Sequence, residues 1–153
     1  MSRAVFLDTS GWLAAVSARE HGHSDVVASY NDLVQRRIVL VTTNLVLAEM
    51  HALVVRQRGA AAGCSLLDAI YADPSYRVTA VTRDLEAAAT DRWLRPFRDQ
   101  SFSLTDAVSF EVMRSERIGE ALALDHHFEI AGYQLLPGAE SHPTKQIRGR
   151  RRP

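Results

Sequence analysis

Four acidic residues, Asp8, Glu49, Asp106 and Asp125, stand among apolar neighbours, where a charge is costly unless it is paired or bound to a metal. If these carboxylates share one cleft, they repel one another and their pKa values rise unless cations neutralise them. Hard oxygen ligands without a required Cys or His suit Mg²⁺ or Mn²⁺. Such ions lower the pKa of a bound water and stabilise the charge that grows on a phosphate. The pattern therefore predicts a metal site suited to phosphoryl chemistry.

Asp8 and Asp125 occupy equivalent places in two short segments. Asp8 follows the apolar run 4–7 and precedes Thr9 and Ser10, and Asp125 follows the mostly apolar run 120–124. Both runs are typical of buried strands, and ligands gather beyond the carboxyl ends of such strands in open α/β sheets. If both strands are parallel and central, the two carboxylates emerge at one edge of the sheet. Capping of the following helix is an equally simple explanation for Asp8.

Glu49 belongs to a helix expected over residues 45–58, where it lies between Leu45 and Leu53 on one i, i+4, i+8 row. This row is expected to face the protein interior, which makes the acid an exception on it. Pairing with an arginine is the alternative to a functional role.

Asp106 lies in the first turn of a helix expected over residues 103–117, on a row with Phe110 and Met113. Ser103 and Asp106 also have capping-box spacing, with Asp in place of the usual Glu or Gln. Capping alone would explain this acid, but capping is compatible with a site, because helix starts lie at one edge of an α/β sheet. Thr9, Ser10 and Thr105 stand near two of the acids, where their hydroxyls could orient waters or a phosphate oxygen, and capping is an equal alternative for them.

Segments of strand character alternate with segments of helical character along the chain. Short runs rich in apolar or β-branched residues predict strands at 4–7, 38–43, 77–82, 120–124 and 133–136. The remaining periodic segments predict helices at 11–16, 23–37, 45–58, 60–72, 85–97, 103–117 and 127–130. This alternation indicates parallel strands joined by right-handed crossovers. We therefore predict an α/β fold, a three-layer α/β/α sandwich around a central, mainly parallel sheet of about five strands.

Composition places the chain among ordinary globular proteins. Its 153 residues are 46% hydrophobic and 24% charged, and 18 basic residues balance 18 acidic ones. Because neither a transmembrane run nor a signal-peptide pattern is present, we expect a soluble, cytoplasmic protein without a membrane partner. The single cysteine, Cys64, is expected to be a small buried hydrophobe. We expect one domain over residues 1–140 and a basic, disordered tail over residues 141–153 that could bind phosphates.

The acidic motifs resemble, in order and spacing, those of PIN-domain nucleases, and most of all the small bacterial VapC-type toxins. The resemblance is carried by residues 6–10 (FLDTS), 47–49 (LAE), 103–107 (SLTDA) and 124–128 (LDHHF), and it spans residues 4–137. Each motif is weak alone, but the four in the correct order are specific.

The resemblance implies a PIN-like fold and a metal-dependent endoribonuclease. It implies that Asp8, Glu49, Asp106 and Asp125 form the catalytic, metal-binding quartet, with Mg²⁺ or Mn²⁺ as the cofactor and Thr9 and Thr105 as nearby hydroxyls. It also implies structured RNA such as tRNA as the substrate, a homodimer, and a cognate VapB-type antitoxin that occupies the cleft.

Three alternatives remain open from the sequence. The first is a PIN nuclease of RNA processing that has no antitoxin. The second is a phospho-acceptor receiver domain, which would require an acidic pair after the first strand and a late strand-end lysine, whereas Lys145 is the only lysine. The third, a haloacid-dehalogenase-like phosphatase, would require an acid where Ser10 stands.

Two further sets of residues receive no role from the sequence. His126 and His127 suggest a general base, but a metal mechanism does not require one. Cationic contacts to the RNA backbone are expected. The arginines considered for them are Arg83, Arg92, Arg95, Arg98, Arg114 and Arg117.

Overall fold

The computed structural model describes residues 3–138. Five strands form one sheet in the order β3-β2-β1-β4-β5, and every neighbouring pair is parallel. The strands are β1 (Ala4–Leu7), β2 (Val39–Thr43), β3 (Tyr76–Thr79), β4 (Glu120–Leu122) and β5 (Gln134–Leu136). This confirms the predicted α/β fold with a parallel central sheet. The basic tail predicted for residues 141–153 lies outside the described residues.

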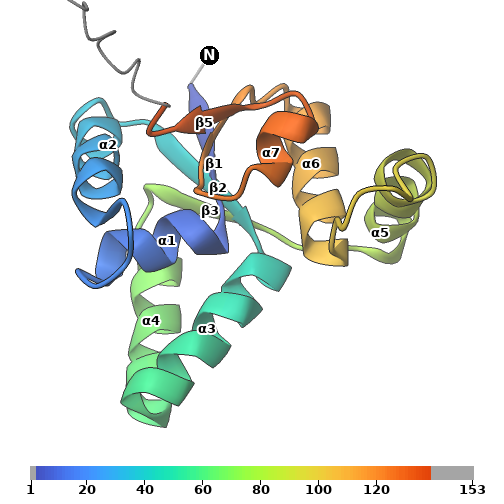
Figure 1. The fold of residues 1–153 in the computed structure, drawn as a ribbon. Coiled ribbons are helices and arrows are strands. Elements are labelled where there is room, and N and C mark those ends of the chain that lie inside the picture. The colour runs from blue at the N-terminus through green and yellow to red at the C-terminus, as the bar shows by residue number, and fades with distance from the viewer. Residues whose placement is uncertain (1–2, 139–153) are drawn as a thin grey trace, which may run out of the picture.

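Seven α-helices and one π-helical segment connect the strands within residues 3–138 (Figure 1). They are α1 (Thr9–Val16), α2 (His23–Gln35), α3 (Asn44–Arg58), α4 (Ala60–Ala72), α5 (Arg83–Ala89), η1 (Thr90–Leu94), α6 (Leu104–Glu116) and α7 (His127–Ile130). The helix expected over 85–97 is therefore divided into α5 and η1, and it ends before Pro96, whose ring cannot continue a helix.

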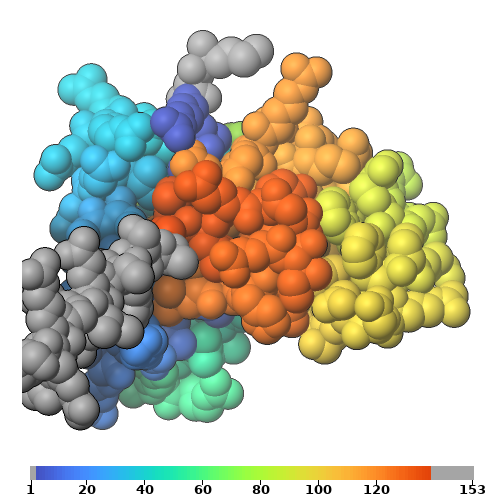
Figure 2. All heavy atoms as spheres, turned by 45° about the horizontal axis from the view of Figure 1, so that its top comes forward, coloured from blue at the N-terminus to red at the C-terminus, as the bar shows by residue number. Residues whose placement is uncertain are grey.

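The sheet is covered on both faces, as alternate residues of β1 show. Val5 and Leu7 point into a core cluster that contains residues of α1, α2, α3 and α4. Phe6 points into a second cluster formed mainly by α6 and α7. Because successive side chains of a strand point to opposite faces, this division confirms the three-layer arrangement. Figure 2 shows α7 and β5, in the reddest colours, filling the surface between α2 and the α5–η1 segment.

Cys64 departs from the expectation, because its side chain is exposed rather than buried. Its neighbour Gly63 is the buried contact of α4 with α3, where an added Cβ would lie 2.6 Å from Cγ2 of Val55. Gly63 allows α4 to approach α3 closely, and the next residue, Cys64, is exposed. Among residues 3–138, no helix is both long enough and apolar enough to cross a membrane.

Candidate functional site

The carboxyl ends of β1 and β4 lie side by side, and this edge holds the candidate site. Leu7 of β1 pairs with Leu122 of β4, and the backbone N–H of Asp8 donates to the carbonyl of Leu122 at 3.2 Å. Helices α1, α3 and α7 start soon after β1, β2 and β4 end. We call Asp8, Glu49, Asp106 and Asp125, which gather here, the acidic site.

Asp8 is both a helix cap and a buried carboxylate. Its side chain is 6% exposed, and its Oδ2 accepts hydrogen bonds from the backbone N–H of Ser10 at 3.0 Å and from Ser10 Oγ at 2.6 Å. Burial raises the pKa of Asp8, the bonds from Ser10 oppose this rise, and the negative charge of Asp106 adds to it. Asp8 therefore caps α1, as one of the two explanations from the sequence expects, and its buried carboxylate stays a predicted metal ligand.

Ser10 joins the two strand ends. Its hydroxyl, which donates to Asp8, also accepts from the backbone N–H of Leu124 at 3.0 Å. The next residue must be glycine, because a Cβ at Gly11 would overlap the carbonyl of Leu122. The sequence placed Ser10 only among possible hydroxyls, and the structure shows that it fixes the orientation of Asp8.

Asp106 also takes part in a helix cap, at the start of α6, and lies in the acidic site. Its Oδ2 accepts from the backbone N–H of Ser103 at 2.9 Å, and its own N–H donates to Ser103 Oγ at 3.0 Å. This is the capping box expected from the spacing of the two residues. The box fixes the first turn of α6, so that Asp106, at 9% exposure, projects towards Asp8 and Asp125.

Glu49 does not face the interior, so the expectation of a buried row is wrong. The apolar residues of α3 divide between clusters on its two sides, with Leu47 and Met50 in one and Val46 in another. The row between them opens at the site, and Glu49 is exposed there. Its Oε2 accepts from Thr9 Oγ1 at 2.8 Å, and its Oε1 accepts from Thr105 Oγ1 at 2.7 Å. The two predicted hydroxyls therefore hold Glu49 between the starts of α1 and α6.

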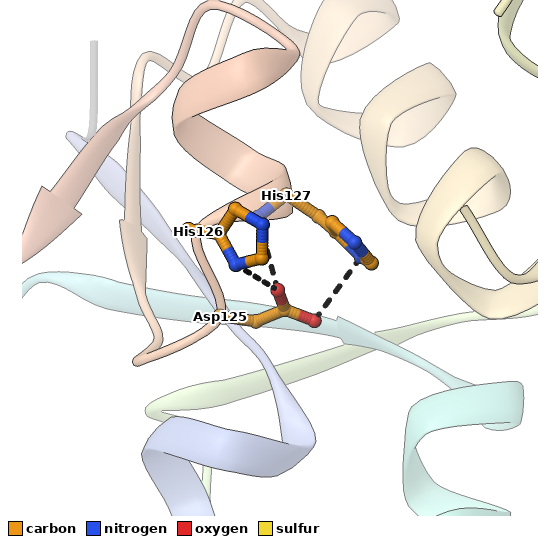
Figure 3. Close-up of side chains that lie close together, drawn as sticks. All are labelled: Asp125, His126 and His127. Atoms are coloured by element: carbon orange, nitrogen blue, oxygen red, sulfur yellow. Dashed lines mark hydrogen bonds and ion pairs between the residues drawn. The ribbon is translucent and has the colours of Figure 1, made fainter. Parts of the chain in front are cut away.

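Asp125 is held by the first turn of α7 (Figure 3). Its Oδ1 accepts from the backbone N–H of His127 at 2.9 Å, and its Oδ2 lies 3.4 Å from His127 Nδ1. The same Nδ1 lies 3.1 Å from Asp106 Oδ2. The neighbouring His126 is 72% exposed, and its Nδ1 lies 3.7 Å from Asp125. The sequence analysis gave His127 no role, although its place two residues after a predicted site acid was a usable signal.

The acidic site contains no arginine or lysine partner within residues 3–138, since its only basic contacts are His126 and His127. Of the arginines considered for RNA contacts, Arg92 and Arg114 pair with Glu111, and Arg95 pairs with Asp91. The site therefore concentrates negative charge that the described part of the chain does not neutralise.

The carboxylate oxygens are donors of the kind that Mg²⁺ and Mn²⁺ prefer. The hydrogen bonds from Ser10 to Asp8, and those from Ser103 and His127 to Asp106, all fall on the Oδ2 atoms. Within residues 3–138, the three potential ligands whose atoms all lie within 4.8 Å of one another are Asp125, His126 and His127, and no three of the four predicted acids lie that close together.

Comparisons with known proteins identify the family of the chain. The PIN domain family model matches residues 5–132. The "23S rRNA-specific endonuclease VapC20" of Mycobacterium tuberculosis is 35% identical over 129 residues, which cover 84% of this chain and 95% of that protein.

Two solved structures have the same fold. The crystal structure of M. tuberculosis VapC20, described as a "Sarcin-Ricin loop cleaving toxin", superposes with a TM-score of 0.72 at 34% identity and covers 85% of this chain and 96% of that one. FitAcB from Neisseria gonorrhoeae has a TM-score of 0.63, with 86% and 96% coverage, and its 14% identity supports the fold alone.

These matches exclude the receiver and dehalogenase-like alternatives. The family model covers most of the chain, and the similarity to VapC20 extends over nearly the whole of that endonuclease. The chain therefore belongs to the PIN-domain family, within its VapC-type endonucleases.

Proposed function

We propose that this protein is a Mg²⁺- or Mn²⁺-dependent endoribonuclease, the toxin of a toxin–antitoxin pair, that hydrolyses phosphodiester bonds of structured RNA. One observation carries the proposal: two carboxylates that follow β1 and β4, and one each from α3 and α6, lie at one sheet edge without an arginine or lysine partner in the described chain. Such a cluster is costly unless a cation completes it.

Asp8, Glu49, Asp106 and Asp125 are the proposed ligands. The Oδ1 atoms of Asp8 and Asp106, whose Oδ2 atoms are held by hydrogen bonds, would bind the cation directly, and Asp125 and Glu49 would contribute directly or through water. When bound, the cation supplies an activated water and stabilises the charge that develops on the phosphate.

The protein's own contribution is to fix these oxygens in advance. Ser10 fixes Asp8, Ser103 fixes Asp106, and the first turn of α7 fixes Asp125. Thr9 and Thr105 hold Glu49 across the open side of the site. Oriented ligands do not have to reorganise when the metal and the RNA bind, which favours catalysis.

The substrate proposal rests on the similarity to VapC20, whose name specifies 23S rRNA and whose structure is described as cleaving the sarcin–ricin loop. We propose a structured stem-loop of this kind, with the sarcin–ricin loop and tRNA as the first substrates to test. The protein would act in the cytoplasm, where these RNAs are found.

We further propose a cognate VapB-type antitoxin that covers the acidic site, and a homodimeric toxin. A PIN nuclease of RNA processing would have no such antitoxin. A toxin gene should lie beside a small open reading frame whose product has a DNA-binding amino-terminal half.

Mapping of RNA 5′ ends after induction of the protein tests the proposal. The matched control is Asp8→Asn, which keeps the cap geometry but removes the charge. A recurrent cut in one RNA that is present with the wild type and absent with Asp8→Asn supports the proposal. Identical 5′ ends in the two samples would refute it.

A further inference from the structure

Among residues 3–138, His127 is the one side chain that contacts two carboxylates of the acidic site on different segments of the fold. Its Nδ1 lies 3.1 Å from Asp106 Oδ2 in α6 and 3.4 Å from Asp125 Oδ2 after β4. Its backbone N–H donates to the other oxygen of Asp125 at 2.9 Å. In Figure 3 the ring of His127 stands directly beside the Asp125 carboxylate.

The contacts specify which ring nitrogen carries the proton. An ionised carboxylate only accepts hydrogen bonds, so a nitrogen that faces two of them must be a donor. The second nitrogen, Nε2, lies 3.4 Å from Ser101 Oγ, whose hydroxyl is able to donate to it. A proton on Nδ1 therefore satisfies the contacts with both carboxylates.

The ring is also held by packing. The His127 side chain is 15% exposed, and its ring meets Phe102 edge to face at 5.2 Å and 77°. Both nitrogens face partners within the protein, so neither is directed at an incoming phosphate. A general-base role, which requires a nitrogen open to water or substrate, does not fit this placement.

We propose that His127 is a positioning residue for the metal site. Its Nδ1–H sets the separation of Asp106 and Asp125 and turns the Oδ1 atom of Asp106 towards the cation. Hydrogen-bond donors behind metal-binding carboxylates act in this way in other metal sites. The inference rests on the proposed function, because it assumes that these carboxylates bind a divalent ion.

Two substitutions of similar shape separate the hydrogen bond from the packing. His127→Asn keeps a neutral donor at the position of Nδ1 but removes the ring, and it cannot act as an acid or base. His127→Leu keeps apolar bulk against Phe102 but removes the donor. His126→Ala, in the same loop, serves as the control for nonspecific disturbance of α7.

The first readout is Mn²⁺ binding to the metal-free protein, measured by titration calorimetry, and the second is the dependence of RNA cleavage on Mn²⁺ concentration. We expect His127→Leu to weaken Mn²⁺ binding and to reduce cleavage at limiting Mn²⁺ by about 10- to 100-fold. We expect His127→Asn to stay within about threefold of the wild type, which is less than 1 kcal/mol. His126→Ala should weaken Mn²⁺ binding and RNA cleavage less than His127→Leu does.

Three results would overturn the inference: His127→Leu binding Mn²⁺ as well as the wild type, His127→Asn failing as badly as His127→Leu, or His126→Ala matching the loss seen in His127→Leu. Nitrogen NMR of the metal-free protein gives an independent check, since a bare Nδ1 with the proton on Nε2 would also contradict it. Failure of the wild type to bind Mn²⁺ or cleave RNA would instead refute the proposed function.

Discussion

Helix α6 carries two buried carboxylates that have opposite surroundings. Glu111 is held by Arg114 at 2.7 Å, Arg92 at 3.2 Å and the indole N–H of Trp93 at 3.0 Å, a group that we call the Glu111 cluster. Asp106, nearer the start of the helix, receives a backbone N–H and His127 but no arginine or lysine of the described chain. Burial of an acid therefore does not by itself indicate a functional site, and the absence of an arginine or lysine partner is what separates Asp106 from Glu111 within the described chain.

The pKa directions show the same contrast. The hydrogen bonds from Arg114 lower the pKa of Glu111, with smaller contributions from Trp93 and from the charge of Arg92. In the acidic site, burial raises the pKa of Asp8, and the charge of Asp106 adds to this rise. The Glu111 cluster stabilises the ionised carboxylate within the fold, whereas we propose that a bound cation does so in the acidic site.

The largest effect is expected from neutralising one proposed metal ligand. Asp8→Asn should reduce RNA cleavage by about a thousandfold, because the metal contributes several kcal/mol of charge stabilisation. Stability should be unchanged or higher, since the substitution removes a desolvated charge that Asp106 repels. Single-turnover cleavage assays and thermal unfolding measure the two quantities. Normal cleavage by the variant would contradict the proposed role of Asp8 as a metal ligand.

The second expected effect is a loss of stability without a loss of cleavage. Glu111→Gln should lower the free energy of unfolding by about 1–2 kcal/mol, because it removes the negative charge and one of the two acceptor oxygens that two arginines and an indole share. The lower part of the usual range applies because Arg92 and Arg114 are about half exposed and can turn to water. Cleavage by the folded variant should remain normal. Urea denaturation measures the stability loss, and loss of cleavage in a folded variant would show that the two regions are not separate.

The pH dependence of stability should differ in sign between the two regions. Glu111 has a lowered pKa, so its stabilisation is present above its ordinary value of 4.5 and is lost as the pH falls through the folded value. Asp8 has a raised pKa, so folding is favoured below its ordinary value of 3.8, and that advantage is lost as the pH rises through the folded value.

Unfolding free energies at pH 7 and pH 4 test this difference. Relative to the wild type, Glu111→Gln should be less stable at pH 7, with a smaller deficit at pH 4. Asp8→Asn should be at least as stable at pH 7, with its advantage reduced at pH 4. Parallel changes in the two variants would show that the two carboxylates do not differ as described.

The smallest effect concerns the hydroxyls that hold Glu49. Thr105→Val removes one hydrogen bond to the carboxylate and should reduce kcat/KM by about two- to tenfold, the equivalent of 0.5–1.5 kcal/mol. Thr105→Ser keeps the hydroxyl and serves as the matched control. Equal losses in both variants would indicate packing rather than hydrogen bonding as the role of Thr105.

The sequence predicted the sheet and the position of Asp8 and Asp125 at the same sheet edge, because strand ends follow from local apolar runs. The capping box at Ser103 and Asp106 was also readable, since it depends on residues three positions apart. The exposure of Glu49 and Cys64 was not predictable, because it depends on which faces of α3 and α4 the rest of the fold covers.

The partners of the buried acids were equally hidden from the sequence. His127 stands two residues from Asp125, but its contact with Asp106 depends on how α7 packs against α6. The neutralisation of Glu111 depends on η1, which brings Arg92 and Trp93 against α6. The two kinds of buried carboxylate therefore became distinguishable only when their three-dimensional neighbours were known.

We propose that a divalent cation neutralises the negative charge of the acidic site. Calorimetric titration of Mn²⁺ into the metal-free wild type, Asp106→Asn and Glu111→Gln tests it most directly. We expect saturable Mn²⁺ binding in the wild type and Glu111→Gln, and loss of that binding in Asp106→Asn. Equal binding by all three proteins, or binding that depends on Glu111 rather than Asp106, would contradict it.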